Sequence, residues 1–485
     1  MPSLLHRRWS RAVLALSPLA AAASVALVPP TEARACGGCF APQDPPTVVT
    51  GHRMVMSVSP TQSVLWDQIV YSGEPEEFAW VLPVKPGARV ESSTAAFFEV
   101  FEANTAIRVV APPINCGGGS SSGFGCGASA FDGAVAEDGG GEPVDVLHQG
   151  TVGPYETVTL STEEPGALNA WLEQHGYNVD PSTQPIVDSY VEEGFDFIAL
   201  RLQPGLGIDR MTPVRVVMPG MNLSLPLRMV GIGTGAFTPI VLYVVTEGRF
   251  TTQNFPEVDL DRSLLSWNFK TQSSNYESLR EDALSENDGR SWLAAYADVG
   301  MFGSNRWDNF GNDISFLPSY LNQALENGEI PTACNATPAI DEGARVVNPC
   351  PPGEPWDSPA CGTVGPGEVD ARTLGCAGAD DVAVALTGLR IQDTWVTRLE
   401  ANLPRAALAD DLQLSASPTQ DPVTNFPQAA IALEEESACP SGVVPRVVQP
   451  GSGAPRGGLV AGLMLFAIAS AWAARRALPR ALARG

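Results

Sequence analysis

The sequence predicts an α+β protein that is rich in β-structure, with mixed, mainly antiparallel sheets, a few short helices, disulfide-bearing loops and a single C-terminal transmembrane helix. Three observations predict it: apolar runs of strand length bounded by turn residues, few stretches with helical spacing, and nine cysteines. The strands do not alternate regularly with helices, so a repeated βαβ architecture is not expected. The 485 residues are enough for one large domain or two ordinary ones.

The expected elements follow from apolar spacing and turn residues. Phe97, Phe98 and Phe101 recur at helical spacing with Glu99 and Glu102 on the other side, which predicts a helix whose phenylalanines lie in the core. Strands are expected at residues 47–57, 62–71, 78–84, 155–161, 195–202, 211–218, 223–230 and 238–246. Helices are expected at residues 94–103, 166–175, 184–193, 278–298, 318–326 and 393–403.

The N-terminal residues 1–35 have the features of a secretory signal peptide. Arg7, Arg8 and Arg11 precede an uncharged stretch, and Ala33-Arg34-Ala35 supplies the small residues of a cleavage site. Cleavage there would make Cys36 the first mature residue. The sequence therefore predicts export, with an extracytoplasmic domain over residues 36–414.

The C-terminal end predicts a membrane anchor. Residues 457–474 carry no charge and would span about 27 Å as a helix at ~1.5 Å per residue, which is enough for a bilayer core. Arginines follow at once, so the tail at residues 475–485 is expected to be cytoplasmic and the body outside, in the periplasm or at the cell surface. Residues 415–456 are rich in Pro, Ser and acids, which predicts an extended stalk between body and membrane.

The charge excludes one class of partner. The formal net charge is −25, and nine of the 29 basic residues lie in the two terminal segments, so the body is more acidic still. Such a body repels phosphate backbones, and we expect no nucleic-acid partner.

The cysteines predict disulfides, because the protein is expected to be exported. We expect two groups of four that pair within themselves, with connectivity left open in each. The first group lies at the mature start and in a Gly/Ser-rich loop at residues 116–143, the second in a Cys/Pro-rich loop at residues 331–376. The members are Cys36, Cys39, Cys116 and Cys126, then Cys334, Cys350, Cys361 and Cys376.

Zinc is the alternative for the first group. Cys36, Cys39, Cys116 and Cys126, with His52 nearby in sequence, could supply a tetrahedral set of ligands. The wide spacing and the oxidising compartment argue against it. Redox chemistry at Cys36-x-x-Cys39 is disfavoured because no strand precedes the motif to place it at a helix N-terminus. No other metal or cofactor is expected.

Catalytic motifs are not convincing. Gly119-Ser120-Ser121-Ser122-Gly123 matches a nucleophile elbow in letters but lies in low-complexity sequence, and residues 231–236 match a dinucleotide fingerprint without a following helix. The mature chain holds three widely spaced histidines, His52, His148 and His175. We therefore assign no catalytic or cofactor-binding residues, and we regard a concave pocket lined by His52 and carboxylates as the feature to look for.

Several short motifs along the chain resemble those of a known family. They are ACGGCF at 35–40, HRM at 52–54, VLWDQIVYSG at 64–73, FAWVLPV at 78–84, VGPY at 152–155, WLEQHGY at 171–177, FDFIALRL at 195–202, TPVRV at 212–216 and VTRLEANLPRAALADDL at 396–412. Together they resemble the DUF2330 family of exported bacterial proteins, over residues 36–415. The resemblance implies export, cysteines and frequent anchoring, with no established activity and no site residues. The C-terminal end loosely resembles the sorting signals of myxobacterial surface proteins, which would imply removal of the tail.

These features together predict a non-catalytic binding or structural module of the cell envelope. Its expected partners are the membrane, through the C-terminal helix, and a protein or glycan at the cell surface. The alternative is a secreted hydrolase or metal-dependent enzyme whose site has no recognisable motif.

Overall fold

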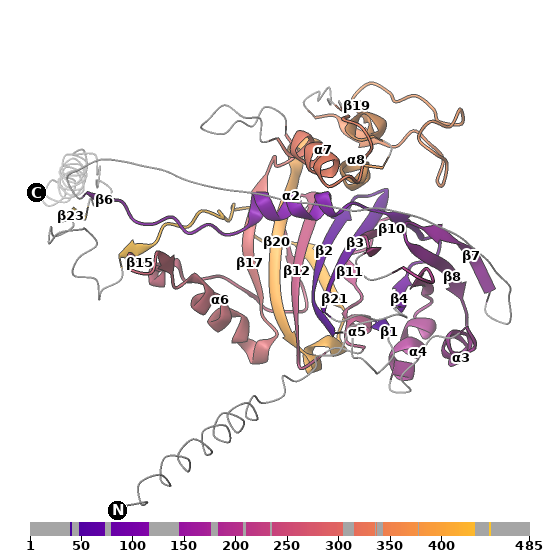
Figure 1. Cartoon of the computed structure of the whole chain (residues 1–485), viewed down its shortest axis with the longest axis horizontal. Helices are drawn as coiled ribbons and strands as arrows, with labels where there is room; N and C mark the ends of the chain where they lie inside the picture. Colours follow the sequence, from indigo (N-terminus) through magenta and orange to yellow (C-terminus); the bar gives the residue numbers. More distant parts are fainter. Residues whose placement is uncertain are drawn as a thin grey trace, which may run out of the picture. The chain divides into compact units, whose positions relative to one another are not determined.

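The computed structural model describes residues 39–40, 48–72, 79–115, 145–175, 183–206, 210–232, 235–303, 315–334, 336, 343–376, 378–431 and 446–447 (Figure 1). They form two compact units. Described residues up to Val109, from 145 to Leu264 and from Tyr276 to Pro427 belong to the larger unit, and the rest belong to the smaller one.

An eight-stranded mixed sheet is the centre of the larger unit. Its order is β14-β17-β20-β12-β2-β3-β10-β5, and every neighbouring pair is antiparallel except β12 with β2 and β14 with β17. Its strands are β2 (Val48–Val58), β3 (Gln62–Ser72), β5 (Arg89–Ser92), β10 (Val214–Pro219), β12 (Phe237–Glu247), β14 (Glu257–Val258), β17 (Trp292–Val299) and β20 (Thr394–Pro404).

A five-stranded antiparallel sheet packs against this sheet. Its order is β1-β4-β9-β8-β7. Met54 of the first sheet and Leu82 and Ile198 of the second lie in one apolar cluster, so the two sheets bury a shared core between them. The strands are β1 (Cys39–Phe40), β4 (Ala79–Val84), β7 (Asp145–Val152), β8 (Tyr155–Ser161) and β9 (Asp196–Leu202).

Helices cover the outer face of each sheet. Successive side chains of a strand point to opposite faces, so Val55 and Trp66 of the first sheet face away from the shared core. They pack against α2 (Ala95–Thr105), α7 (Phe316–Glu326) and α8 (Asp381–Leu386). On the second sheet, α3 (Ala167–Gln174) and α4 (Gln184–Glu192) cover the face that carries Phe197.

Shorter elements complete the two units. The larger unit also holds α5 (Leu227–Val230), α6 (Tyr276–Ser285), β11 (Ser224–Leu225), β13 (Phe250–Thr252), β18 (Arg345–Val347), β19 (Glu368–Asp370) and β21 (Leu412–Ala416). Its 3₁₀ turns are η3 (Arg262–Leu264), η4 (Asn287–Gly289), η5 (Ala371–Leu374), η6 (Ile391–Asp393) and η7 (Arg405–Ala409). The smaller unit holds β6 (Ile114–Asn115), β15 (Ser266–Asn268), β16 (Ser273–Ser274), β22 (Ala430–Ile431) and β23 (Arg446–Val447).

The predicted β-rich class with mixed sheets and few helices is confirmed, and so is the burial of Phe97, Phe98 and Phe101. Three predicted elements are wrong in part or in full. Residues 278–298 contain α6 only up to Ser285 and then β17; residues 393–403 are mainly β20; residues 223–230 contain the two-residue β11 followed by α5. β20 was predicted as a helix because the strand is buried on both faces and therefore does not alternate between apolar and polar residues. Its buried Arg398 and Glu400 look in the sequence like the polar side of a helix.

Most of the predicted terminal and loop segments lie outside the described residues, whereas the start of the predicted stalk is described. Residues 1–35, 116–143, 457–474 and 475–485 lie outside the described residues, and within the described part no helix is long and apolar enough to cross a membrane. Residues 415–427, predicted as the start of a stalk, pack on the body. Ala416 belongs to β21, and the buried Asn425 side chain donates hydrogen bonds to the carbonyl oxygens of Asn104 and Ala106.

The Cys/Pro-rich loop carries two cysteine pairs. Cys334 pairs with Cys376, and Cys350 pairs with Cys361, with Cα atoms 6.4 Å and 4.0 Å apart. The second predicted group of four therefore pairs within itself, and the structure supplies the connectivity that the sequence left open.

Candidate functional site

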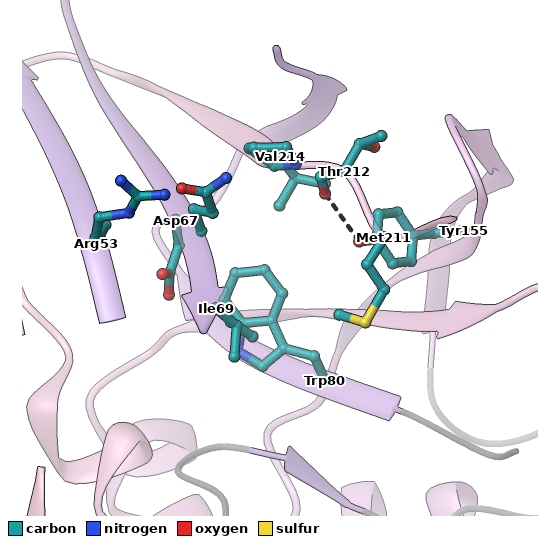
Figure 2. A pocket seen from close by; sticks show the side chains of 10 residues that line it. Arg53, Asp67, Ile69, Trp80, Tyr155, Met211, Thr212 and Val214 are labelled. Carbon is teal, nitrogen blue, oxygen red and sulfur yellow. Dashed lines mark hydrogen bonds between the residues drawn. The ribbon is translucent and has the colours of Figure 1, made fainter. Parts of the chain in front are cut away.

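A hollow of about 310 Å³ lies where β3 and the chain leading into β10 diverge (Figure 2). The last register pair between β10 and β3 is Val214 with Asp67, whereas β3 itself runs on to Ser72. Because no pairing of β10 follows beyond Asp67, side chains of both sheets surround the space. They are Arg53, Asp67, Gln68, Ile69, Trp80, Tyr155, Met211, Thr212, Pro213 and Val214, and we call this space the β3 pocket.

Two polar side chains of the β3 pocket have buried atoms without a hydrogen-bond partner. Arg53 on β2 and Gln68 on β3 are directly opposite in the antiparallel register, so their Cβ atoms lie roughly 4.5–5.5 Å apart on one face of the sheet. Arg53 Nε and Gln68 Oε1 are both buried, and neither bonds to any described residue. Both side chains belong to the face of the first sheet that carries Val55 and Trp66, whereas Asp67 and Ile69 belong to the opposite face, so the β3 pocket is lined from both sides of the sheet edge.

Asp67 contributes a carboxylate whose orientation is fixed by a hydrogen bond from His52. His52 Nδ1 lies 3.3 Å from Asp67 Oδ1 and 3.2 Å from Oδ2. The carboxylate can only accept a hydrogen bond, so Nδ1 is the donor. The two residues are only 2% and 4% exposed, and His52 Nε2 has no hydrogen-bond partner among the residues that the structure describes. His52 thus orients the Asp67 carboxylate, but His52 makes no hydrogen bond to any other described side chain that could act as a nucleophile.

Aromatic and apolar side chains form the remaining wall. Trp80 stands at the start of β4 and Tyr155 at the start of β8, so both come from the second sheet. The Tyr155 hydroxyl donates a hydrogen bond of 2.8 Å to the carbonyl oxygen of Thr212, which fixes the segment that carries Met211 (Figure 2). The β3 pocket therefore has one apolar side that includes an indole ring and one side with hydrogen-bonding groups.

The positive charge of Arg53 also acts on Glu102, which belongs to the hydrogen-bond network beneath α2. Burial opposes ionisation of Glu102, but Arg398, the hydrogen bond from Tyr243 and, more weakly, Arg53 together lower the pKa of this carboxyl. Arg398 already donates to Glu102 and Glu400. Glu102 is thus paired with Arg398 and does not use the free Nε of Arg53.

The structure brings together few of the predicted site residues. His52 pairs with Asp67 behind the β3 pocket and does not line it. Cys39 lies opposite Trp80 in the β1–β4 register. Cys36, Cys116 and Cys126 lie outside the described residues, where the disulfide and zinc alternatives stay predictions. Among described residues, no three His, Cys, Asp or Glu side chains gather as metal ligands.

Sequence reasoning missed Arg53, Asp67 and Gln68 as site residues. The available signal was polar side chains inside two apolar strands, in the motifs HRM and WDQ. A charged residue in a strand that reads as core needs a partner or a ligand, and only the register shows which one it has.

A comparison with protein families shows to which family this chain belongs. A family model described as an uncharacterised protein conserved in bacteria (DUF2330) matches residues 30–295, more than half of the chain. The chain belongs to this family. All residues that line the β3 pocket fall within the matched DUF2330 region, which ends within β17. No curated protein and no solved structure matches the chain significantly.

Proposed function

We propose that this DUF2330 protein is an exported binding module of the cell envelope, held at the membrane by its C-terminal segment, and that the β3 pocket is its ligand site. The observation that carries the binding role is the hollow of about 310 Å³ at the point where β10 no longer pairs with β3, which polar side chains such as Arg53 and Gln68 and apolar side chains such as Ile69 line together. Small-molecule sites combine apolar walls with a few fixed polar groups in this way.

Export and anchoring rest on the terminal sequence features and on the cysteines. Cysteine pairs in the larger unit suit an oxidising compartment outside the cytoplasm. The uncharged residues 457–474 and the arginines after them suit an anchor with the body outside.

The export test uses intact cells that produce the full-length chain. An impermeant amine reagent should label the body, and a chain ending at residue 455 should appear in the soluble extracytoplasmic fraction. Full-length protein found in the cytoplasmic fraction with all thiols reduced would contradict export, and a truncated chain that stays in the membrane would contradict the anchor.

The binding test uses thermal unfolding of the full-length protein against a library of small metabolites. A ligand that binds only the folded state raises the melting temperature with its concentration. Gln68→Met should reduce the shift because it removes a polar group from the lining at nearly constant side-chain length, whereas the exposed Gln392→Met is the matched control. Equal shifts in the two variants would place binding elsewhere.

A further inference from the structure

The helix α2 carries Phe97, Phe98 and Phe101 into the aromatic core, but it has no cap of its own at its start. The side chain of Thr94, the residue before the helix, does not cap the first turn, and no acidic residue lies in that turn. The first amides of a helix have no partner within the helix, so they need acceptors from elsewhere. The start of α2 therefore depends on groups that lie far away in the sequence.

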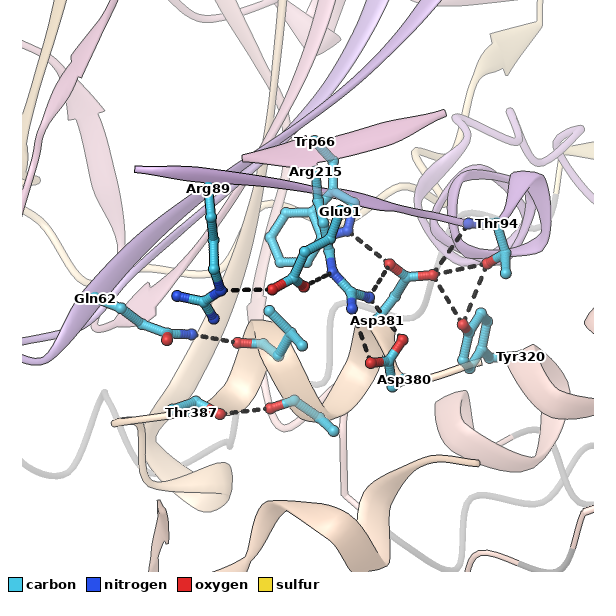
Figure 3. Close-up of polar contacts among 12 residues, drawn as sticks. Gln62, Trp66, Arg89, Glu91, Thr94, Arg215, Tyr320, Asp380, Asp381 and Thr387 are labelled. Carbon is cyan, nitrogen blue, oxygen red and sulfur yellow. Dashed lines mark hydrogen bonds and ion pairs between the residues drawn. The ribbon is translucent and has the colours of Figure 1, made fainter. Parts of the chain in front are cut away.

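Two carboxylates from distant segments supply these acceptors. Glu329, shortly after α7, accepts hydrogen bonds from the amides of Ala95 and Ala96. Asp381, at the start of α8, accepts from the amide of Thr94 at 3.2 Å and from its hydroxyl at 2.8 Å (Figure 3). Anionic acceptors suit this end of a helix, because the N-terminus carries a partial positive charge. The cap of α2 thus needs both carboxylates, since each accepts from amides that do not bond to the other.

The Cys334–Cys376 disulfide joins the two segments that carry these carboxylates. Cys334 follows Glu329 by five residues, and Cys376 precedes Asp381 by five residues. The two cysteines themselves are 42 positions apart. Without the disulfide, the two segments would be linked covalently only through the long Cys/Pro-rich loop, and holding the ends of such a loop together costs conformational entropy.

We infer that the Cys334–Cys376 disulfide is a redox-sensitive latch, which holds the cap of α2 in place when it is oxidised and loosens the cap when it is reduced. The reductant is a dithiol. One of its thiolates attacks a sulfur of the disulfide, the Cys334–Cys376 bond breaks, and the second thiolate resolves the mixed disulfide. The dithiol is oxidised to a disulfide, and its two protons end on the cysteine thiols. Both cysteines are partly exposed, whereas Cys350 of the other disulfide is buried, which favours attack on the latch.

The second disulfide of the loop offers an internal comparison. Cys350 and Cys361 are 11 positions apart and close a short ring within the Cys/Pro-rich loop. Within the described residues, no hydrogen bond links this ring to α2, Glu329 or Asp381. Opening the ring should therefore leave the cap of α2 unchanged.

The experiment is hydrogen–deuterium exchange of the full-length protein, followed by mass spectrometry, before and after treatment with dithiothreitol. Amide exchange reports the local opening of hydrogen-bonded structure. The amides at the start of α2 should exchange roughly tenfold faster or more after reduction, whereas those of β9 in the five-stranded sheet should keep their protection. Alkylation of the free thiols identifies the reduced cysteines, and reoxidation should restore slow exchange.

Two double variants assign the effect to one disulfide. Cys334→Ser with Cys376→Ser should exchange at the start of α2 as fast as the reduced protein, with no further change when dithiothreitol is added. Cys350→Ser with Cys361→Ser is the matched control, and it should exchange slowly until dithiothreitol opens the latch. If either variant does not fold, stepwise reduction of the unmodified protein still decides, because alkylation shows which bond is open when exchange accelerates.

Three outcomes would overturn the latch. Exchange at the start of α2 that stays slow while Cys334 and Cys376 are free thiols would show that the cap does not need the bond. Equal acceleration in both double variants would show that the effect does not belong to this disulfide. Equal acceleration at α2 and β9 would show that reduction destabilises the whole larger unit instead of the cap. None of these outcomes bears on the β3 pocket, because the latch does not rest on ligand binding.

Discussion

Replacing Asp381 with asparagine is expected to destabilise the larger unit strongly, because this carboxylate is fully buried and accepts hydrogen bonds from four residues (Figure 3). Oδ1 accepts from Trp66 Nε1 at 2.8 Å and from Arg215 Nη1 at 2.9 Å. Oδ2 accepts from the Thr94 amide at 3.2 Å, from the Thr94 hydroxyl at 2.8 Å and from the Tyr320 hydroxyl at 2.9 Å.

The magnitude follows from which donors lose their acceptor. An asparagine must replace one oxygen by an NH₂ group. At Oδ1 this would strand the Trp66 and Arg215 donors; at Oδ2 the two hydroxyls can reverse and only the Thr94 amide is stranded. Each buried unsatisfied donor costs ~1–3 kcal/mol, and the lost charge on the bond to Arg215 adds to it. We expect about 3 kcal/mol for Asp381→Asn and about 5 kcal/mol for Asp381→Ala, near the range for breaking a buried pair.

Urea denaturation followed by tryptophan fluorescence measures this difference from the midpoint and slope. Asp393→Asn is the matched control, because its carboxylate is 44% exposed, and it should change stability by less than ~0.5 kcal/mol. A loss below about 1 kcal/mol for Asp381→Asn, with an unchanged slope, would refute the reasoning that this carboxylate is the essential acceptor of the network.

Three further predictions concern the larger unit. Gly388→Ala should cost more than ~2 kcal/mol in urea unfolding, since φ is +87° and a Cβ would overlap the Ser59 hydroxyl; an unchanged midpoint would contradict it. Burial opposes ionisation of Glu91, but Arg215 and a second arginine lower its pKa below the ordinary 4.5. Stability from Glu91 is therefore present above about pH 4.5 and is lost as the pH falls through the lowered pKa, so Glu91→Gln should flatten stability against pH in that window; the same slope in both proteins would speak against it. Phe97→Ala should cost ~3–5 kcal/mol by opening a cavity in the aromatic core; thermal unfolding checks this, and a loss below ~1 kcal/mol would show a site that collapses freely.

Local patterns predicted the elements whose two faces differ in polarity. The helix with Phe97, Phe98 and Phe101 could be predicted because its apolar residues recur at helical spacing. The pattern failed at β20, where both faces are buried and Arg398 and Glu400 are neutralised by partners that only the fold brings near. A pattern within one segment contains no information about such partners.

The β3 pocket could not be predicted from the sequence for a related reason. Arg53 and Gln68 are 15 residues apart and become neighbours only through the β2–β3 register. The hollow exists because the pairing of β10 with β3 ends at Asp67. The sequence contained the residue types and the strands, but a one-residue change of register would place the same side chains on other faces.

The matched DUF2330 region cannot be a complete folding unit in this chain. It ends at residue 295, yet β20 lies between β17 and β12 in the eight-stranded sheet, and both of those strands begin within the matched region. Trp66, Thr94 and Arg215 also lie within it, and all three donate to Asp381, which lies beyond it. Without the later segment these donors would be buried unsatisfied, and β17 would lose its antiparallel neighbour. The β3 pocket, although lined wholly by matched residues, therefore depends on residues after 295 for the sheet that shapes it.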